Sequence, residues 1–305
     1  MKVKVGVVGV GAIGRNHARI YSELDTAELV AVYDANAESA AKVASEFGTS
    51  VANSVEELVE MVDAASVSTP TVTHRDIGTL FLTAGKHVLV EKPISDSVDD
   101  ARALIDLAKE NGCILQVGHI ERFNPVMSQL EARLNSPKFI ESHRLSPFPK
   151  RSLDIGVVLD LMIHDLEIVL HLVNSPIQHI DAVGIPVLTR REDIANARIR
   201  FENGCVANIT ASRISPERLR KIRVFQGDAY LSLDYQDQSG WIYRKDGMEI
   251  GREEVEVEKE EPLKCELAAF VDCASKGEQP KVSGQQGAAA LDVALEITRL
   301  IEESQ

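Results

Sequence analysis

A glycine-rich turn near the amino terminus constrains the fold of this 305-residue chain more than any other feature. The β-branched run Val3–Val10 leads into Gly9-Val10-Gly11-Ala12-Ile13-Gly14, and a helical pattern follows at once. In such a turn the first glycine permits the tight bend, the second lets a pyrophosphate approach the backbone, and the third lets helix and strand pack closely. Asp34 ends the next strand-like run 20 residues after Gly14, where a carboxylate accepts hydrogen bonds from a ribose. The spacing predicts a dinucleotide-binding turn.

The carboxylate of Asp34 also bears on the choice of cofactor. It would repel a 2′-phosphate, so we expect NAD rather than NADP. The plain alternative is a tight turn without a ligand, followed by a solvated aspartate. The cofactor contacts expected from this part of the chain are Gly9, Gly11, Ala12, Ile13, Gly14 and Asp34.

Short β-branched runs alternate with helical stretches through the first 118 residues. Strands that alternate with helices of this length are typical of parallel βαβ units, and right-handed crossovers then give a doubly wound sheet. The expected strands are Val3–Val10, Leu29–Asp34, Thr49–Ala52, Ala64–Thr69, His87–Glu91 and Ile114–Val117. The expected helices cover 12–24, 37–47, 55–61, 73–85 and 98–111.

The pattern changes after residue 120, which predicts one domain over 1–120 and a second over 121–305. Short turns such as Glu202-Asn203-Gly204 predict hairpins, so the second domain should hold an open, mostly antiparallel sheet with helices on one face. The acidic segment 249–261 suits an exposed edge strand. Helices are expected at 124–135, 155–173, 263–276 and 285–303, and strands at 138–147, 179–188, 194–201, 204–212, 220–226, 229–234 and 240–244.

Charge and composition exclude several classes of partner. The chain has 33 basic and 47 acidic side chains, a net charge of −14, which disfavours nucleic acid and anionic membranes as partners. The amino terminus has a strand pattern rather than that of a signal peptide, and the longest apolar run is too short to cross a bilayer. Four cysteines without a Cys-x-x-Cys pair suit a reducing compartment. We therefore expect a cytoplasmic protein.

Two groups of residues are candidates for catalysis. Lys92 follows the strand His87–Glu91 at the carboxyl edge of the expected sheet, where such folds bind ligands, and could lower the pKa of a substrate hydroxyl. Asp160 and His164 are four residues apart in an apolar helical stretch, so the carboxylate can orient the imidazole as a general base. A surface Glu–Lys pair and a buried structural histidine are the corresponding plain alternatives.

A metal site built from Asp160, His164 and His171 is a further alternative for the same helix. Two of these residues lie within one turn and the third lies two turns on, a spacing that disfavours a shared metal ion. We therefore expect no metal.

Several motifs in this order resemble the glucose–fructose oxidoreductase / inositol dehydrogenase / rhizopine catabolism (Gfo/Idh/MocA) family. They are the glycine turn, Asp34, Ser68-Thr69-Pro70 with His74, Glu91-Lys92-Pro93, the segment from Gly118 to Pro125, and Asp160 with His164. The resemblance covers essentially the whole chain. It implies an NAD-binding Rossmann domain over 1–120, and a substrate domain over 121–305 that forms homodimers or homotetramers through its sheet.

The resemblance also implies a reaction, namely nicotinamide-dependent oxidation or reduction at a sugar or polyol carbon. Lys92 would contact the reacting hydroxyl, His164 would exchange its proton, and Asp160 would orient His164. Further cofactor contacts would come from Ser68, Thr69, Pro70, His74, Glu91 and Lys92, and substrate contacts from Lys92, His119, Arg122, Asn124, Arg151, Asp160 and His164. Thr71 and Ile120 stand where many members of the family carry asparagine.

Two segments narrow the expectation within the family. His119–Pro125 and Asp154–Asp165 are similar to those of its UDP-N-acetylglucosamine 3-dehydrogenase branch. A diphosphate would need local cations, for which Arg122, Arg144, Lys150, Arg151 and Arg213 are candidates. An inositol or hexose dehydrogenase, a regulator that binds the dinucleotide without turnover, and a glycosidase that uses bound NAD transiently are the alternatives.

Overall fold

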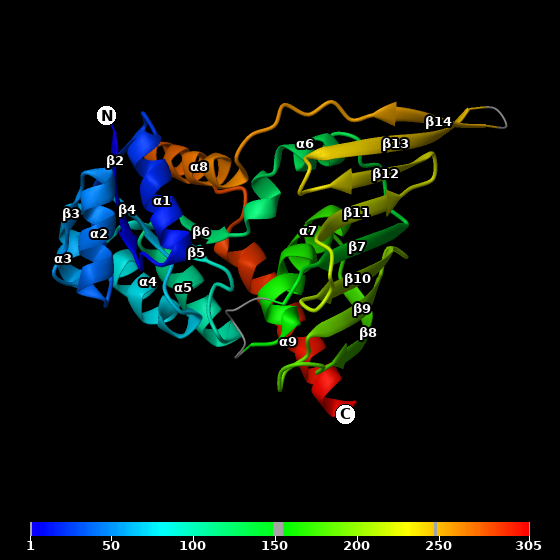
Figure 1. Ribbon diagram of the computed structural model, residues 1–305, viewed down its shortest axis with the longest axis horizontal. Helices are drawn as coiled ribbons and strands as arrows, with labels where there is room; N and C mark the ends of the chain where they lie inside the picture. Colours follow the sequence, from blue (N-terminus) through cyan, green and yellow to red (C-terminus); the bar gives the residue numbers. More distant parts are fainter. Residues whose placement is uncertain (1, 149–154, 247–248, 305) are drawn as a thin grey trace. The chain divides into compact units, whose positions relative to one another are not determined.

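The computed structural model describes residues 2–148, 155–246 and 249–304 (Figure 1). The chain forms two compact units, each assembled from two stretches of sequence. The first unit comprises 1–123 and 261–288, and the second comprises 124–260 and 289–305. Each unit is described by itself below.

The first unit contains a six-stranded parallel sheet with the strand order β3-β2-β1-β4-β5-β6. The order reverses its direction at β1, which is the doubly wound arrangement predicted from the alternating pattern. In such a sheet ligands bind where the order reverses, at the carboxyl ends of the strands. The strands are β1 (Val3–Val8), β2 (Ala27–Tyr33), β3 (Ser50–Val51), β4 (Ala64–Val67), β5 (His87–Glu91) and β6 (Leu115–Gly118).

Helices connect these strands and start and stop at residues suited to helix ends. The side chains of Asn36, Ser54 and Ser97 accept a backbone hydrogen bond at the N-termini of three helices. Gly48 ends one of them in the left-handed conformation. The helical elements are α1 (Ala12–Glu23), α2 (Ala37–Phe47), α3 (Val55–Met61), η1 (Thr71–Thr73), α4 (His74–Thr83), α5 (Val98–Glu110), η2 (Ile120–Phe123) and α8 (Pro262–Lys276).

Helix α8 belongs to the first unit although it follows the second sheet in sequence. Leu267, Phe270 and Val271 of this helix are fully buried and join the core formed by β1, α1 and α2. The domain boundary expected at residue 120 therefore differs from the structure, which returns 261–288 to the dinucleotide-binding unit. The apolar stripe of an amphipathic helix shows that the helix packs against a core, but the stripe does not specify which core.

The second unit contains an eight-stranded sheet with the order β14-β13-β12-β11-β7-β10-β9-β8. Neighbouring strands are antiparallel except β7 and β10, which are parallel, so the expected mostly antiparallel sheet is confirmed. The expected acidic edge strand is β14, at one end of the order. The strands are β7 (Phe139–Leu145), β8 (Ile177–Ile185), β9 (Ile194–Phe201), β10 (Val206–Ser212), β11 (Leu219–Phe225), β12 (Ala229–Asp234), β13 (Ser239–Asp246) and β14 (Glu249–Glu254).

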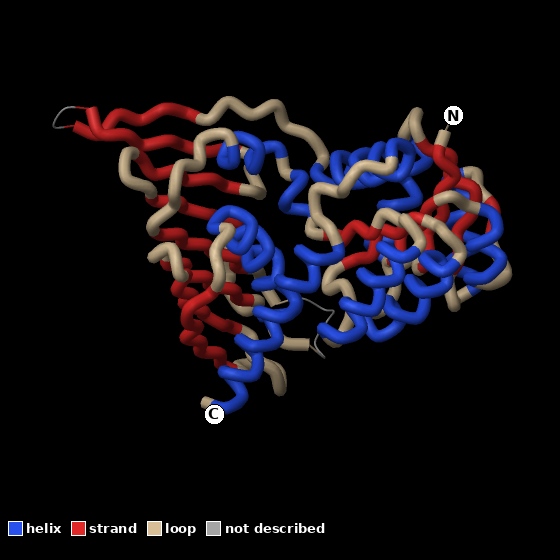
Figure 2. Tube along the Cα trace, turned by 180° about the vertical axis from the view of Figure 1, so that it is seen from behind, coloured by secondary structure: helices blue, strands red, loops and turns tan. Residues whose placement is uncertain are grey.

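Helices of the second unit lie on one face of this sheet (Figure 2). They are α6 (Pro125–Glu131), η3 (Val158–Met162), α7 (Ile163–Val173) and the part of α9 (Gly284–Glu303) that follows residue 288. The core between helices and sheet is aliphatic and includes Ile163, Ile209 and Val224. The single helix expected over 155–173 differs from the structure, because η3 is a short π-helix that precedes α7. Within the described ranges, no helix has the length and hydropathy needed to cross a bilayer.

Candidate active site

The glycine turn of the first unit lies between β1 and α1 and leaves open space at one position only. Gly9 has a φ of 81°, which favours glycine. A Cβ at Gly14 would lie 1.8 Å from the carbonyl oxygen of Gly9, so no larger residue fits there. A Cβ at Gly11 would meet nothing within 4 Å. The backbone is therefore tightly packed on both sides of a position that a ligand can approach.

The N-terminus of α1 faces this open position without a protein side chain to cap it. Gly11 is the N-cap residue, and within the described residues the helix has no side-chain cap hydrogen bond. Unbonded amides at a helix N-terminus bind phosphate groups, and the helix dipole adds to the attraction. Ala12 and Ile13 form the first turn, and the side chain of Ile13 is 39% exposed. These features fit the pyrophosphate of a dinucleotide.

A buried hydroxyl beside the glycine turn supports the same fit. The Oγ atom of Ser68 is buried, and it has no hydrogen-bond partner among the described residues. The backbone of Ser68 packs against Gly9, and its Cβ lies 3.3 Å from the position of a Cβ at Gly14. A buried polar atom without a partner is costly, so a ligand or water is expected beside it. Asp34 lies directly after β2, at the same edge of the sheet as the glycine turn and Ser68.

His74 joins two loops of the first unit. Its Nε2 lies 2.9 Å from the carbonyl oxygen of Thr69, and its Nδ1 lies 3.0 Å from that of Pro93. The ring is 1% exposed, and burial lowers the pKa of His74 although the carbonyl groups oppose the shift. Each ring nitrogen thus faces a protein carbonyl group, and the single N–H of a neutral imidazole donates to one of the two. The expected cofactor contact is not supported for either nitrogen, and His74 instead links the Thr69-Pro70 turn to the Lys92-Pro93 loop.

Glu91 points into the interior of the first unit. Its Oε1 lies 3.1 Å from Nε2 of His17, a side chain of α1, although the direction is unsuited to a hydrogen bond. A Cβ at Gly118 would lie 2.9 Å from the carboxyl carbon of Glu91, so glycine makes room for this side chain. Glu91 therefore lies among protein groups, while Lys92 follows it at the carboxyl end of β5. The expected cofactor contact of Glu91 stays a prediction.

A fully buried carboxyl lies near Glu91. Glu266 on α8 is fully buried, and neither of its oxygens has a hydrogen-bond partner in the described part of the chain. Burial raises the pKa of Glu266 well above its usual value, and the charges of Glu91 and Glu121 add to the shift. The folded protein therefore holds the proton of Glu266 more tightly than water-exposed glutamate would hold it. Nothing in the sequence marked this residue, because its burial depends on where α8 packs.

Asp160 and His164 lie on consecutive helical elements of the second unit. Asp160 is in the π-helix η3, and His164 is in the first turn of α7. Both side chains are half-buried. Single π turns inside helices are rare and occur frequently at functional sites. A carboxylate and an imidazole at this spacing suit an acid–base role.

Two of the arginines considered for a diphosphate are engaged within the protein. Arg144 Nε donates to Asp165 Oδ2 at 2.6 Å, and Arg213 Nε donates to Asp193 Oδ1 at 2.9 Å. All four side chains are buried. These arginines compensate carboxylates of the core, so the expectation that they bind a diphosphate is not supported. The two partners, Asp165 and Asp193, could not be recognised from sequence spacing.

The remaining expected substrate residues differ in what the structure shows of them. His119 and Arg122 are buried. Asn124 donates to the carbonyl oxygen of Tyr235 at 2.9 Å and accepts from the amide of Val126, so it caps α6. Lys150 and Arg151 lie outside the described residues. His171, considered above as a metal ligand, lies 3.0 Å from Glu131.

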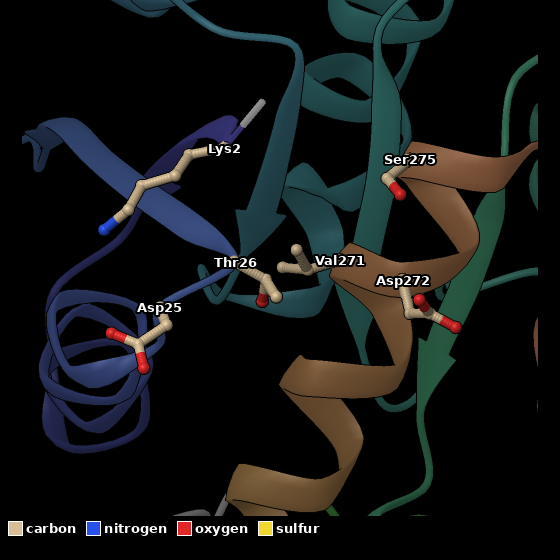
Figure 3. Close-up of a pocket in the computed structure, with 6 residues that line it drawn as sticks. All are labelled: Lys2, Asp25, Thr26, Val271, Asp272 and Ser275. Carbon is tan, nitrogen blue, oxygen red and sulfur yellow. The ribbon is translucent and has the colours of Figure 1, made fainter.

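The candidate residues divide between the two units. Lys92 and the dinucleotide residues belong to the first unit, whereas Asp160 and His164 belong to the second. The first unit also has a pocket at the opposite edge of its sheet, where the strands begin (Figure 3). This pocket has a volume of about 380 Å³ and is lined by Lys2, Asp25, Thr26, Val271, Asp272 and Ser275. It lies away from the carboxyl ends, where this type of sheet binds its cofactor.

Comparisons with known proteins match both units. A profile described as "Oxidoreductase family, NAD-binding Rossmann fold" matches residues 3–119, and one described as "GFO/IDH/MocA C-terminal domain" matches residues 128–231. A UDP-N-acetylglucosamine 3-dehydrogenase of Acidithiobacillus ferrooxidans is 37% identical over 98% of this chain and 97% of its own length. The chain belongs to the Gfo/Idh/MocA family of oxidoreductases. The predicted family, fold class and NAD cofactor are thereby confirmed.

The comparisons also include a further relative and solved structures. A scyllo-inositol 2-dehydrogenase (NAD(+)) of Bacillus subtilis is 29% identical over 70% of this chain and 68% of its own length. The solved structure of the Acidithiobacillus ferrooxidans enzyme superposes with a TM-score of 0.95 and covers 99% of each chain. A levoglucosan dehydrogenase with a TM-score of 0.90 covers 100% of this chain and 98% of its own, and at 17% identity it supports the fold alone.

Proposed function

We propose that this oxidoreductase oxidises the 3-hydroxyl of UDP-N-acetylglucosamine to the 3-keto sugar with NAD. The observation that carries the proposal is the similarity to a UDP-N-acetylglucosamine 3-dehydrogenase along both units, with 37% identity over 98% of the chain. The glycine turn, the uncapped N-terminus of α1 and Asp34 support NAD as the cofactor.

The proposed chemistry uses three side chains. Lys92 hydrogen-bonds the reacting hydroxyl and lowers its pKa, and the imidazole of His164 accepts the hydroxyl proton. Asp160 orients the imidazole and stabilises its charged form. NAD held by the glycine turn and Asp34 would supply the hydride acceptor for C3. The products are the 3-keto sugar, NADH and one proton, so atoms and electrons balance.

Substrate recognition is the second part of the proposal. A diphosphate needs local cations in a chain with a net charge of −14, and a guanidinium group matches phosphate oxygens in pairs. Arg144 and Arg213 are engaged with buried carboxylates. Arg122 and Arg151 are therefore the arginines we propose for this role, together with His119 and Asn124 as further substrate contacts.

The test is turnover of the purified protein with NAD on UDP-N-acetylglucosamine, free N-acetylglucosamine, inositols and hexoses at equal concentrations. NADH absorbance and product mass are both recorded, because a cofactor that is recycled gives no net NADH. We expect fast turnover of the UDP-sugar, inhibition by UDP and poor turnover of the free sugar. Loss of the remote nucleotide contacts lowers catalysis as well as affinity when binding energy positions the reacting carbon.

A second candidate is a dehydrogenase for a free inositol, which the similarity to inositol 2-dehydrogenases favours. Its reaction would use the same three side chains but no cations for a diphosphate. Oxidation of a free inositol or hexose as fast as the UDP-sugar, without inhibition by UDP, would support this candidate. That result would contradict the proposal that the substrate is a nucleotide sugar, but it would agree with the proposed dehydrogenase chemistry.

We further infer that the protein forms a homo-oligomer through the face of the second sheet opposite its helices. Aromatic rings stack in a row along that face, with centroid distances of 5.6, 5.1 and 4.3 Å between successive rings. The row consists of Phe139, Phe225, Tyr230 and Tyr243. Partly exposed aromatic rows are favoured at interfaces, and light scattering should report a dimer or tetramer that Tyr230→Lys dissociates.

A cytoplasmic location is the last part of the proposal. It is supported by four free thiols and by dependence on NAD, a cofactor of the cell interior. Cell fractionation followed by immunodetection tests it, and recovery in a secreted fraction would contradict it.

A further inference from the structure

A buried ion pair follows His164 directly in the second unit. Asp165 lies in the first turn of α7, and its carboxylate accepts from Arg144 Nε at 2.6 Å and from Ser142 Oγ at 2.8 Å. Both donors come from β7, so the link runs from the sheet to the helix. Asp165 and Arg144 are 2% and 4% exposed, and Ser142 is fully buried.

Apolar residues of β10 flank this pair. Side chains alternate along β7, so Ile140, Ser142 and Arg144 point to the core, and the register with β10 places Ile209 beside Ser142 and Ala211 beside Arg144. A buried ion pair in such a setting is often no more stabilising than apolar side chains of the same volume. Its charged hydrogen bonds are directional, however, whereas apolar contacts allow a helix to rotate or slide. The physical effect expected from the pair is therefore a fixed orientation of α7.

The segment just before α7 has a buried contact of its own. Val158–Met162 forms the π-helix η3, a geometry that is rare and occurs frequently at functional sites. Its N-terminal end is held by Glu192, whose carboxylate accepts from the amide of Val158 at 3.3 Å and whose carbonyl oxygen accepts from the amide of Val157 at 2.9 Å. A Cβ at Gly156 would lie 1.8 Å from Glu192 Oε1, so this contact requires glycine.

We propose that Arg144 and Asp165, with Ser142, are positioning residues that fix the imidazole of His164 for proton transfer. The proposal rests on the proposed function, in which His164 is the base. Successive residues of a helix differ by about 100° around its axis, so a carboxylate clamped to the sheet sets the direction of the preceding side chain. Glu192 holds the other end, and the stretch that carries Asp160 and His164 is fixed between two buried contacts.

The central variant replaces both charges with apolar side chains, Arg144→Met with Asp165→Leu. We expect unfolding in urea near that of the unaltered protein, because neither charge is left uncompensated. We expect kcat to fall by about 10–100-fold with little change in KM or NAD affinity, since a misplacement of about 1 Å costs on the order of 10²-fold. Ser142→Ala removes one hydrogen bond to Asp165 and should lower kcat by a smaller factor. This variant tests the proposal if the double variant folds poorly.

A matched control comes from the opposite face of the same strand. Glu141 pairs with Arg223 at 3.0 Å on the outer face of β7, and both side chains are partly exposed. Glu141→Gln removes one carboxylate charge without a change of shape, as Asp165→Asn does on the inner face. We expect Glu141→Gln to keep the unaltered kcat, whereas Asp165→Asn lowers it.

A spectroscopic measurement makes the test independent of substrate. In protein labelled with ¹⁵N at histidine, the signals of His164 are assigned by comparison with His164→Ala. We expect sharp signals in the unaltered protein and shifted or broadened signals in the double variant, with those of His179 unchanged. If the double variant keeps both the unaltered kcat and the unaltered His164 signals, the pair is only structural and the proposal is overturned. If the signals change in the double variant but His164→Ala retains turnover, the positioning role stands and the proposed chemistry fails.

Discussion

The carboxylate of Asp34 accepts a hydrogen bond from the backbone amide of Val10 at 2.8 Å, within the glycine turn. Its second oxygen accepts from the amide of Asn36, also at 2.8 Å. An ionised carboxylate has about four acceptor positions, so room remains for ribose hydroxyls. The residue predicted to select the cofactor therefore also holds the loop that is expected to contact the pyrophosphate. The two roles have a common physical basis, because both depend on the negative charge at the end of β2.

Asp34→Ser should weaken NAD binding and narrow the preference for NAD over NADP. The charged hydrogen bonds to the ribose and the repulsion of a 2′-phosphate are lost together, and each hydrogen bond to a charged group contributes about 1.5–3 kcal/mol. Titration calorimetry with both cofactors measures the change. Asp63→Ser is the matched control, because Asp63 accepts from the amide of Lys4 at the other edge of the sheet. Equal affinity of the unaltered protein for NADP and NAD would show that Asp34 does not have this role.

His164→Ala and Lys92→Met should each leave NAD affinity nearly unchanged while turnover falls steeply. A positioned acid–base group contributes about 10²–10⁴-fold to the rate, so losses in that range are expected. The turnover of Asp160→Asn should lie between that of these variants and that of the unaltered protein if the carboxylate only orients the imidazole. Lys86→Met, before the start of β5, serves as the control and should keep full turnover. Near-normal rates in His164→Ala would contradict its role as the base.

His74→Phe should lower both stability and turnover. The ring joins the Thr69 and Pro93 carbonyls, and an unsatisfied buried polar group costs about 1–3 kcal/mol. Because Pro93 follows Lys92 directly, looser packing of this loop should also misplace the lysine. Urea unfolding and kcat are measured side by side. His179→Phe, an exposed histidine paired with Asp181, is the comparison, and equal effects of the two substitutions would argue against the linking role.

Glu266→Gln should stabilise the protein increasingly as pH rises. The folded protein holds the proton of Glu266 more tightly than the unfolded chain, because burial raises its pKa and the charges of Glu91 and Glu121 add to the effect. Its contribution to stability is thus fully present below the unfolded pKa of about 4.3 and is lost as pH rises toward the raised folded value. A glutamine side chain does not ionise, so the free energy of unfolding of Glu266→Gln should lack this decline with rising pH.

Urea unfolding at pH 5 and pH 8 measures the effect of Glu266→Gln. The groups around this carboxyl include Tyr21, Glu91 and Glu121, all of which are unaltered in the variant. Glu110→Gln on α5 replaces an exposed carboxyl of the same unit and should leave the pH dependence as it is. Parallel pH dependence in Glu266→Gln and the unaltered protein would mean that Glu266 ionises freely in the folded state.

Much of the fold could be predicted from the sequence, because the patterns involved are local. The order of strands and helices up to β6 follows from alternating periodicities, and the glycine turn from the spacing of Gly9, Gly11 and Gly14. The acidic edge strand followed from its charge pattern. Lys92 was expected at the carboxyl end of β5, because every parallel strand of such a sheet ends at the same edge.

Only the tertiary structure decided which partners the buried charges have and which core each helix joins. The sequence alone determined that α8 is amphipathic, and packing assigned it to the first unit, where Glu266 became buried. Arg144 and Arg213 were expected to bind a ligand, but buried carboxylates pair with both. Such pairings join residues about 20 positions apart on different elements, so the periodicity of the sequence cannot predict them. Local propensity and spacing therefore specified the elements and the cofactor turn, while non-local packing decided the electrostatics around His164.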